Sequence, residues 1–79
     1  MIHARDDYNR IQDPAGLIAE DEPVFLLRAK DKFAPEVVAY WASLLQREGT
    51  QPEMADMAMQ HSRAMKDWQH INGKKTPDL

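Results

Sequence analysis

The chain has 79 residues, of which 43% are hydrophobic and 29% charged, with a net charge of −3 and no cysteine. These values are ordinary for a folded domain, and they exclude a disulfide framework, a thiolate metal site and the composition of a disordered chain. The acidic balance also argues against general nucleic-acid binding, which needs a concentrated lysine and arginine surface.

The length predicts one small domain over residues 1–79. A chain of this size buries only about 60% of the surface that its unfolded form exposes, so small domains commonly gain stability from a disulfide, a metal or a second subunit. Without cysteine, self-association is the expected supplement. The charged start at 1–7 and the short apolar run at 24–27 predict neither a signal peptide nor a membrane span, so we expect a cytoplasmic protein.

Residues 1–22 predict an irregular arm, because Asp13-Pro14-Ala15-Gly16 has the composition of a turn and an acidic run follows it. Residues 23–33 are ambiguous. Helical spacing of Leu26, Ala29 and Phe33 favours a third short helix, whereas the apolar run at its start is also typical of a buried strand. Since no partner strand is evident, a strand here would favour pairing across a dimer.

Residues 35–48 predict an amphipathic helix that begins at Pro35 and ends before Gly49. Six large residues give this helix a wide apolar face, which must be covered. They are Val37, Val38, Tyr40, Trp41, Leu44 and Leu45.

Residues 51–72 predict a longer second helix that ends before Gly73. Thr50, followed three residues later by Glu53, fits a capping box at its start. An apolar stripe recurs along the helix at alternating steps of three and four residues. The stripe consists of Met54, Met57, His61, Ala64, Trp68 and Ile71, with Ala58 and Met65 beside it.

The short connection between the two helices predicts an antiparallel hairpin. The expected fold class is therefore mainly α, with a helical hairpin at about 35–48 and 51–72. We expect the short helix or strand at about 23–33 and the irregular arm to pack across this hairpin, and residues 74–79 to form a mobile tail.

Chemistry-bearing residues do not converge in the sequence. Thioethers and an imidazole suit Cu(I), but a helix directs Met59 away from Met57 and His61, so we predict no metal site and no cofactor. Ser43 and Ser62 lie inside helices without a nucleophile motif, and the acidic runs lie in the arm. We therefore predict no catalytic residue and no enzymatic activity.

Two kinds of binding surface are expected instead. Methionine and aromatic side chains on the helices predict an adaptable apolar surface. Basic residues close to an aromatic pair predict the alternative, a pocket for a phosphorylated or nucleotide-like ligand. The predicted interaction residues are Arg28, Lys30, Tyr40, Trp41, Met57, His61, Met65 and Trp68.

The runs RDDYNRIQDP (5–14) and DEPVFLLRAKD (21–31), with Ala34-Pro35 and Trp41-Ala42 beyond them, resemble a group of short proteins from bacteria and their phages. No activity is assigned to that group, so the resemblance transfers no site. It implies a free-standing phage-type accessory protein that binds or inhibits a host factor.

The expected function is a non-enzymatic protein interaction module that self-associates, with itself, a host protein or both as partners. The alternative is an oligomeric small-ligand binding protein in which Arg28, Lys30 and Tyr40 line the pocket. We expect neither a nucleic acid nor a membrane as a partner.

Overall fold

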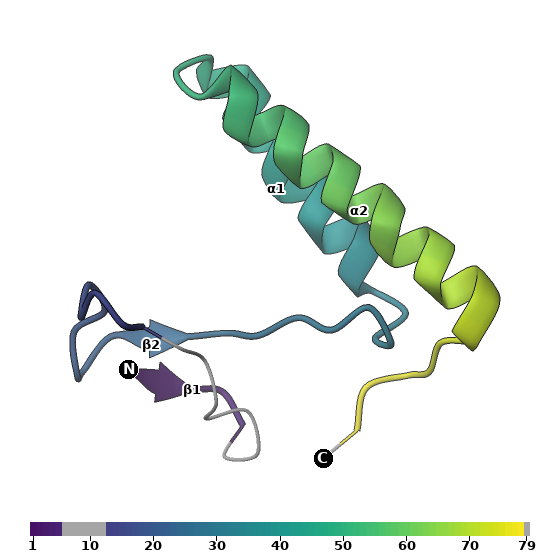
Figure 1. The fold of residues 1–79 in the computed structure, drawn as a ribbon, viewed down its shortest axis with the longest axis horizontal. Helices are drawn as coiled ribbons and strands as arrows, with labels where there is room; N and C mark the ends of the chain where they lie inside the picture. The colour runs from purple at the N-terminus through teal and green to yellow at the C-terminus, as the bar shows by residue number, and fades with distance from the viewer. Residues whose placement is uncertain (6–12, 79) are drawn as a thin grey trace.

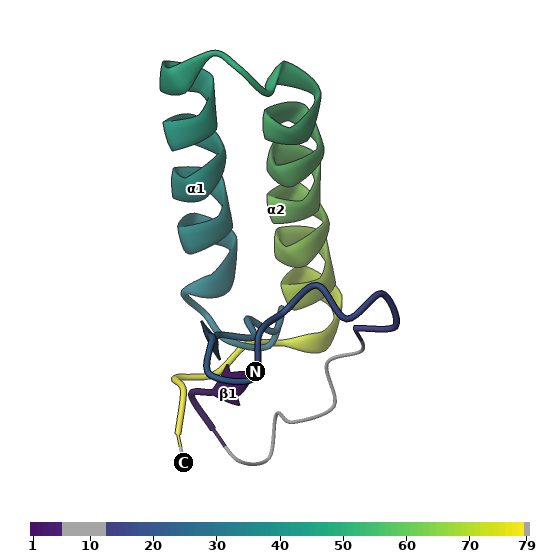
Figure 2. The same ribbon diagram turned by 90° about the vertical axis from the view of Figure 1, so that its left-hand side faces the viewer.

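A computed structural model of the chain describes residues 1–5 and 13–78. Its elements are β1 (Ile2–His3), β2 (Pro23–Val24), α1 (Ala34–Glu48) and α2 (Pro52–Asn72). The two helices pack side by side as an antiparallel hairpin, and the two strands form a small sheet beyond its base (Figure 1 and Figure 2). The protein is mainly α, and the predicted hairpin is confirmed.

Local sequence explains the limits of α1. Pro35 occupies its first turn, where the missing amide proton costs nothing, and Glu36 lies near the positive end of the helix dipole. At the other end Gly49 adopts a left-handed conformation with φ of 79°, and its N–H donates to the Leu45 carbonyl oxygen at 2.9 Å. This is the glycine stop that the sequence predicts.

We expect Gly49→Ala to destabilise the protein by about 1–2 kcal/mol, because an alanine Cβ disfavours the left-handed conformation. A Cβ added to Gly49 would meet no atom within 4 Å, so the cost comes from the backbone alone. Urea unfolding at a fixed protein concentration measures the change. Gly49→Asn, which tolerates this conformation better, should recover part of the loss, and equal stability of alanine and glycine would contradict the expectation.

The start of α2 differs from the predicted capping box. Gln51 is the residue before the helix and makes no capping hydrogen bond through its side chain. The Thr50 hydroxyl instead donates to Oε1 of Glu48 at 2.8 Å. Because Pro52 starts the helix, Thr50 lies one residue too early for its hydroxyl to cap the first turn, and the capping-box prediction is wrong.

Small side chains fill the contact between the helices. The Ser62 hydroxyl, itself buried, donates to the Pro35 carbonyl oxygen at 2.6 Å and ties the two helices together near the base of the hairpin. Among the described residues, no large side chain is fully buried. The buried hydrophobic residues are Ala34, Ala42, Ala55, Ala58 and Met65.

The buried stripe of α2 is not the one that the sequence predicts. Ala55, Ala58, Ser62 and Met65 are also spaced by three and four residues, and this neighbouring stripe faces α1. Met57 on the predicted stripe is 63% exposed. Because alanine and serine let two helices approach closely, the larger side chains are displaced to the flank of the contact.

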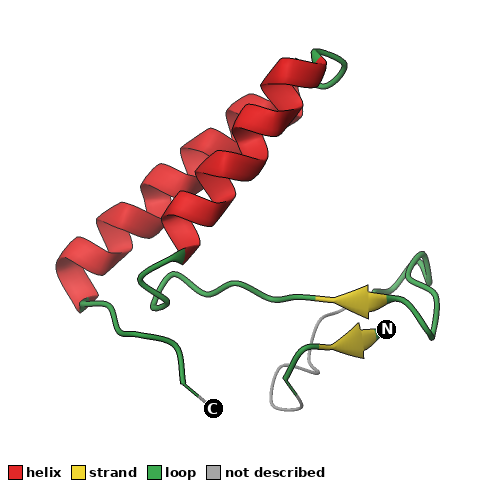
Figure 3. Cartoon of the chain, turned by 180° about the vertical axis from the view of Figure 1, so that it is seen from behind, coloured by secondary structure: helices red, strands yellow, loops and turns green. Residues whose placement is uncertain are grey.

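The segment at 23–33 contains a strand and no helix. β2 pairs in parallel with β1, with Ile2 opposite Pro23, and the Ile2 N–H donates to the Glu22 carbonyl oxygen at 2.7 Å. The favoured helix is therefore wrong, and the strand at 23–24 pairs with residues 2–3 of the same chain, so it needs no pairing across a dimer. Figure 3 shows the sheet standing apart from the helices, so within the described residues the two strands do not pack across the hairpin as expected of the arm and the 23–33 segment.

The segment before α1 is fixed to both the second helix and the chain end. The Gln69 side-chain amide donates to the carbonyl oxygens of Ala29 and Asp31 at 2.7 and 3.0 Å. Lys75 forms a parallel bridge with Asp31 through two backbone hydrogen bonds, of 2.9 and 3.0 Å. Lys75, in the segment predicted as a mobile tail, is thus attached at the base of the hairpin.

Candidate functional site

The hairpin has one apolar and one polar face. Successive residues of a helix turn by 100°, so the exposed apolar residues of each helix lie about a quarter turn from its buried residues. In α1 and in α2 the exposed apolar residues are rotated from the buried residues in the same sense. Because the helices are antiparallel, this rotation brings the exposed apolar residues of both helices to the same side of the hairpin. We call this the apolar face; it consists of Val37, Trp41, Leu44, Met54, Met57, His61 and Trp68.

Residues that are rotated from the buried residues in the opposite sense lie on the other side of the hairpin. We call this side the polar face and define it by Glu36 and Ala39 of α1 and Lys66 and His70 of α2. These four residues line one cavity, which confirms that they lie on the same side of the hairpin. The two faces therefore differ in chemistry, and both are available in a single chain.

The apolar face is open over its whole length. Trp41 in its centre is 47% exposed, and Trp68 near the base is 41% exposed. Each tryptophan therefore keeps almost half of its surface in water, and a partner that covered it would gain in proportion to the apolar area removed from water.

The structure separates the predicted interaction residues. Four of them belong to the apolar face: Trp41, Met57, His61 and Trp68. Tyr40 is exposed on α1, outside both the contact with α2 and the apolar face. Met65 is buried between the helices and is not available to a partner.

Arg28 and Lys30 line a separate cavity of about 110 Å³ below the hairpin, together with Lys75 and Asp78. Tyr40 does not line it, so within one chain the predicted ligand-binding set is not brought together. The Lys75 ammonium donates to the Asp78 carboxylate at 2.9 Å, and this bond and charge lower the pKa of Asp78. The cavity is smaller than the roughly 300 Å³ at which small-molecule sites begin.

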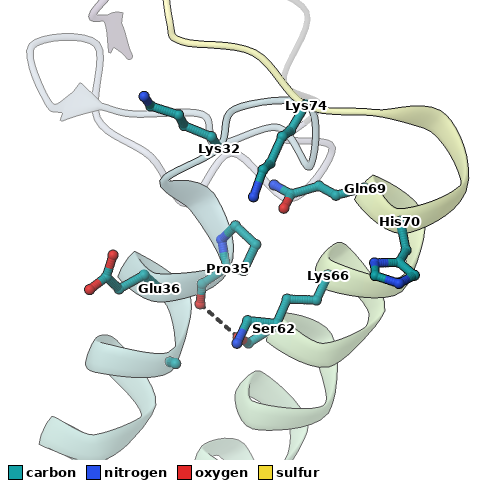
Figure 4. Close-up of a pocket in the computed structure, with 9 residues that line it drawn as sticks. Lys32, Pro35, Glu36, Ser62, Lys66, Gln69, His70 and Lys74 are labelled. Atoms are coloured by element: carbon teal, nitrogen blue, oxygen red, sulfur yellow. Dashed lines mark hydrogen bonds between the residues drawn. The ribbon is translucent and has the colours of Figure 1, made fainter.

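A second cavity, of about 530 Å³, lies on the polar face between the first turn of α1 and the last turns of α2 (Figure 4). Sequence reasoning missed it, although Lys66 and His70, four residues apart on one helix, were a signal for it. Lys32 and Lys74, which also line it, are distant in sequence and meet because of the bridge at Lys75.

No group of three or more histidine, cysteine, aspartate or glutamate side chains in residues 1–5 and 13–78 is placed to hold a metal ion. Within the same ranges, neither helix combines the length and the apolar character needed to cross a membrane.

These features define a small, mainly α-helical protein of two packed helices and a two-stranded parallel sheet. No family model matches the chain, and neither a curated protein nor a solved structure matches it. The resemblance to short bacterial and phage proteins therefore stays a prediction, and the function has to be argued from the two faces and their cavities.

Proposed function

We propose that this chain is a non-enzymatic protein interaction module whose first partner is a second copy of itself, bound through the apolar face. The observation that carries the proposal is an excess of surface. The chain exposes 6416 Å², about 1,500 Å² more than the roughly 4,900 Å² that a compact monomer of 9.1 kDa exposes.

The dimensions agree with this excess. The radius of gyration is 14.1 Å, whereas a compact domain of this length has a radius of about 11.6 Å. Part of the extra surface belongs to the projecting sheet, and the apolar face supplies another part. A stable interface of standard size buries about 800 Å² on each partner, which is only about half of the excess.

The composition of the apolar face suits a copy of itself. His61 lies within it and Glu48, seven residues after Trp41, continues its α1 stripe at the end away from the base. Trp41 and Trp68 provide the large aromatic anchors that usually dominate binding energy. Two antiparallel helices that pack face to face with an identical pair form a four-helix bundle, whose core would hold the side chains that a single hairpin leaves in water. Such a pairing is a two-fold symmetric dimer.

Sedimentation velocity and light scattering on the full chain, over a concentration series from micromolar to several hundred micromolar, test the proposal. We expect twice the chain mass over most of the series and a melting temperature that rises with protein concentration, because folding and pairing are linked. A folded monomer with a concentration-independent melting temperature would contradict the dimer. That result would favour a different protein, such as the host factor implied by the resemblance, as the partner of the apolar face.

A further inference from the structure

We infer that the 530 Å³ cavity on the polar face binds a small phosphorylated molecule with a polar, non-aromatic organic part. The cavity lies on the side of the hairpin opposite the apolar face, so it stays open in the proposed dimer. The inference therefore does not depend on the proposed function, and each can fail without the other.

The cavity gathers positive charge in a chain that is acidic as a whole. Lys32, Lys66 and Lys74 line it together with the imidazole of His70, and Glu36 is the one described carboxylate among the lining residues. The chain has a net charge of −3. A concave surface lined by one sign of charge focuses the field and raises the local concentration of ions of the opposite sign.

These ammonium groups have not been neutralised by the protein. Lys75 pairs with Asp78, but none of the three lysines that line the cavity forms an ion pair with a carboxylate in the part of the chain that the structure describes. Lys32 lies over the ring of Phe33, at 5.1 Å from its centre. Lys66 and Lys74 therefore carry the charge that an anion would meet.

The side chains of Lys66 and Lys74 reach the same space from two different elements. Figure 4 shows both extending into the gap between the start of α1 and the end of α2, while Lys32 and Glu36 extend away from it. The first turn of α1 borders this gap with the positive end of its dipole, and the last turn of α2 borders it with the negative end, so the two dipoles oppose each other and the ammonium groups supply the positive charge. Lysine binds a phosphoryl group as a point charge, and two lysines match its double negative charge.

The rest of the lining limits the organic part of the ligand. Pro35 and Ala39 supply small apolar patches, and the Gln69 amide is held in place by its two bonds to the backbone. The described lining holds no phenylalanine, tyrosine or tryptophan, and Figure 4 shows its one aromatic ring, the His70 imidazole, beside α2 and apart from the two ammonium groups. A base between these groups therefore has no large ring on which to stack. The volume lies within the roughly 300–1,000 Å³ of small-molecule sites, which leaves room for more than a phosphate ion.

Calorimetric titration of ribose 5-phosphate into the full chain at low salt, with amide shifts recorded by NMR, tests the inference. We expect saturable binding with a dissociation constant near or below about 1 mM, shifts centred on residues 66–70 and 74, and displacement by inorganic phosphate. Ribose without phosphate should not bind. Absence of saturation below about 10 mM, or equal binding of ribose, would overturn the inference.

Matched variants locate the site. Lys66→Gln and Lys74→Gln should each weaken binding about tenfold, as the loss of a charge-assisted hydrogen bond predicts, while Lys66→Arg should retain it. Arg47→Gln removes a positive charge in the last turn of α1, at the other end of the hairpin, and should change affinity less than about twofold. Equal weakening by Arg47→Gln would show general charge attraction and contradict a built site. Adenosine monophosphate binding much more tightly than ribose 5-phosphate would contradict the non-aromatic assignment.

Discussion

Met57→Glu is expected to turn the proposed dimer into a monomer, with a dissociation constant at least about 100-fold higher than that of the unaltered chain. Met57 is 63% exposed in the single chain, so a carboxylate there costs little before pairing. In the dimer the same carboxylate would be buried twice, once from each copy, on a face that contains no lysine or arginine. Burial of an unpaired charge costs several kcal/mol, and about 2.7 kcal/mol already gives the 100-fold change. Sedimentation equilibrium measures it.

Gln60→Glu is the matched control for this substitution. It adds the same charge to the same helix less than one turn away, at an exposed position outside the apolar face. We expect its dissociation constant to stay within about threefold of the starting value, since exposed charge changes are weak. If the two variants weakened association equally, or if neither did, the interface would not be the apolar face.

Ala42→Leu is expected to destabilise the hairpin by about 2–3 kcal/mol. Ala42 is fully buried, and the Ser62–Pro35 hydrogen bond sets a register in which Ala42 faces Ala55, two helical turns further along. A leucine at this contact would have to push the helices apart, and overpacking of this kind costs about 1–3 kcal/mol. For a chain of this length, total stability is only about 4–12 kcal/mol, so the loss is large.

Gln46→Leu provides the comparison, because it places the same side chain one turn along α1 at an exposed position. Leucine and glutamine have similar helix propensities, so we expect a change below about 0.5 kcal/mol. Urea unfolding of both variants at one protein concentration measures the two changes in the free energy of unfolding. Unchanged stability of Ala42→Leu would mean that the helices are not held together through their small residues.

The hairpin was predictable because its signals are local. Pro35, Gly49 and Gly73 mark helix limits through their own backbone preferences, which need no information from elsewhere in the chain. Local signals do not fix the exact first residue of a helix, as the predicted capping box at Thr50 shows. A shift of one residue in the start of the helix removes the Thr50 hydroxyl from its predicted partner.

The surface residues were predictable only in part. The sequence places Trp41 and Met57 on apolar stripes, and in the structure both are exposed on one face. The prediction grouped Met65 with them, although Met65 is buried between the helices. A residue beside an apolar stripe can lie either at the edge of the contact between two helices or inside it, and the sequence does not distinguish these positions. Lys66 and Lys74, two of the three lysines that line the polar cavity, are separated by the end of α2, and no prediction was made for them.

The sequence by itself determined two helices, their limits and their antiparallel connection, because these depend on the preferences of neighbouring residues. The tertiary structure decided which of two adjacent stripes is buried, since close packing selects the alanine and serine stripe over the larger side chains beside it. It also decided the pairing of 2–3 with 23–24 and the meeting of Lys32, Lys66 and Lys74 around one cavity. Both depend on contacts between residues far apart in the chain, for which no local pattern carries a signal.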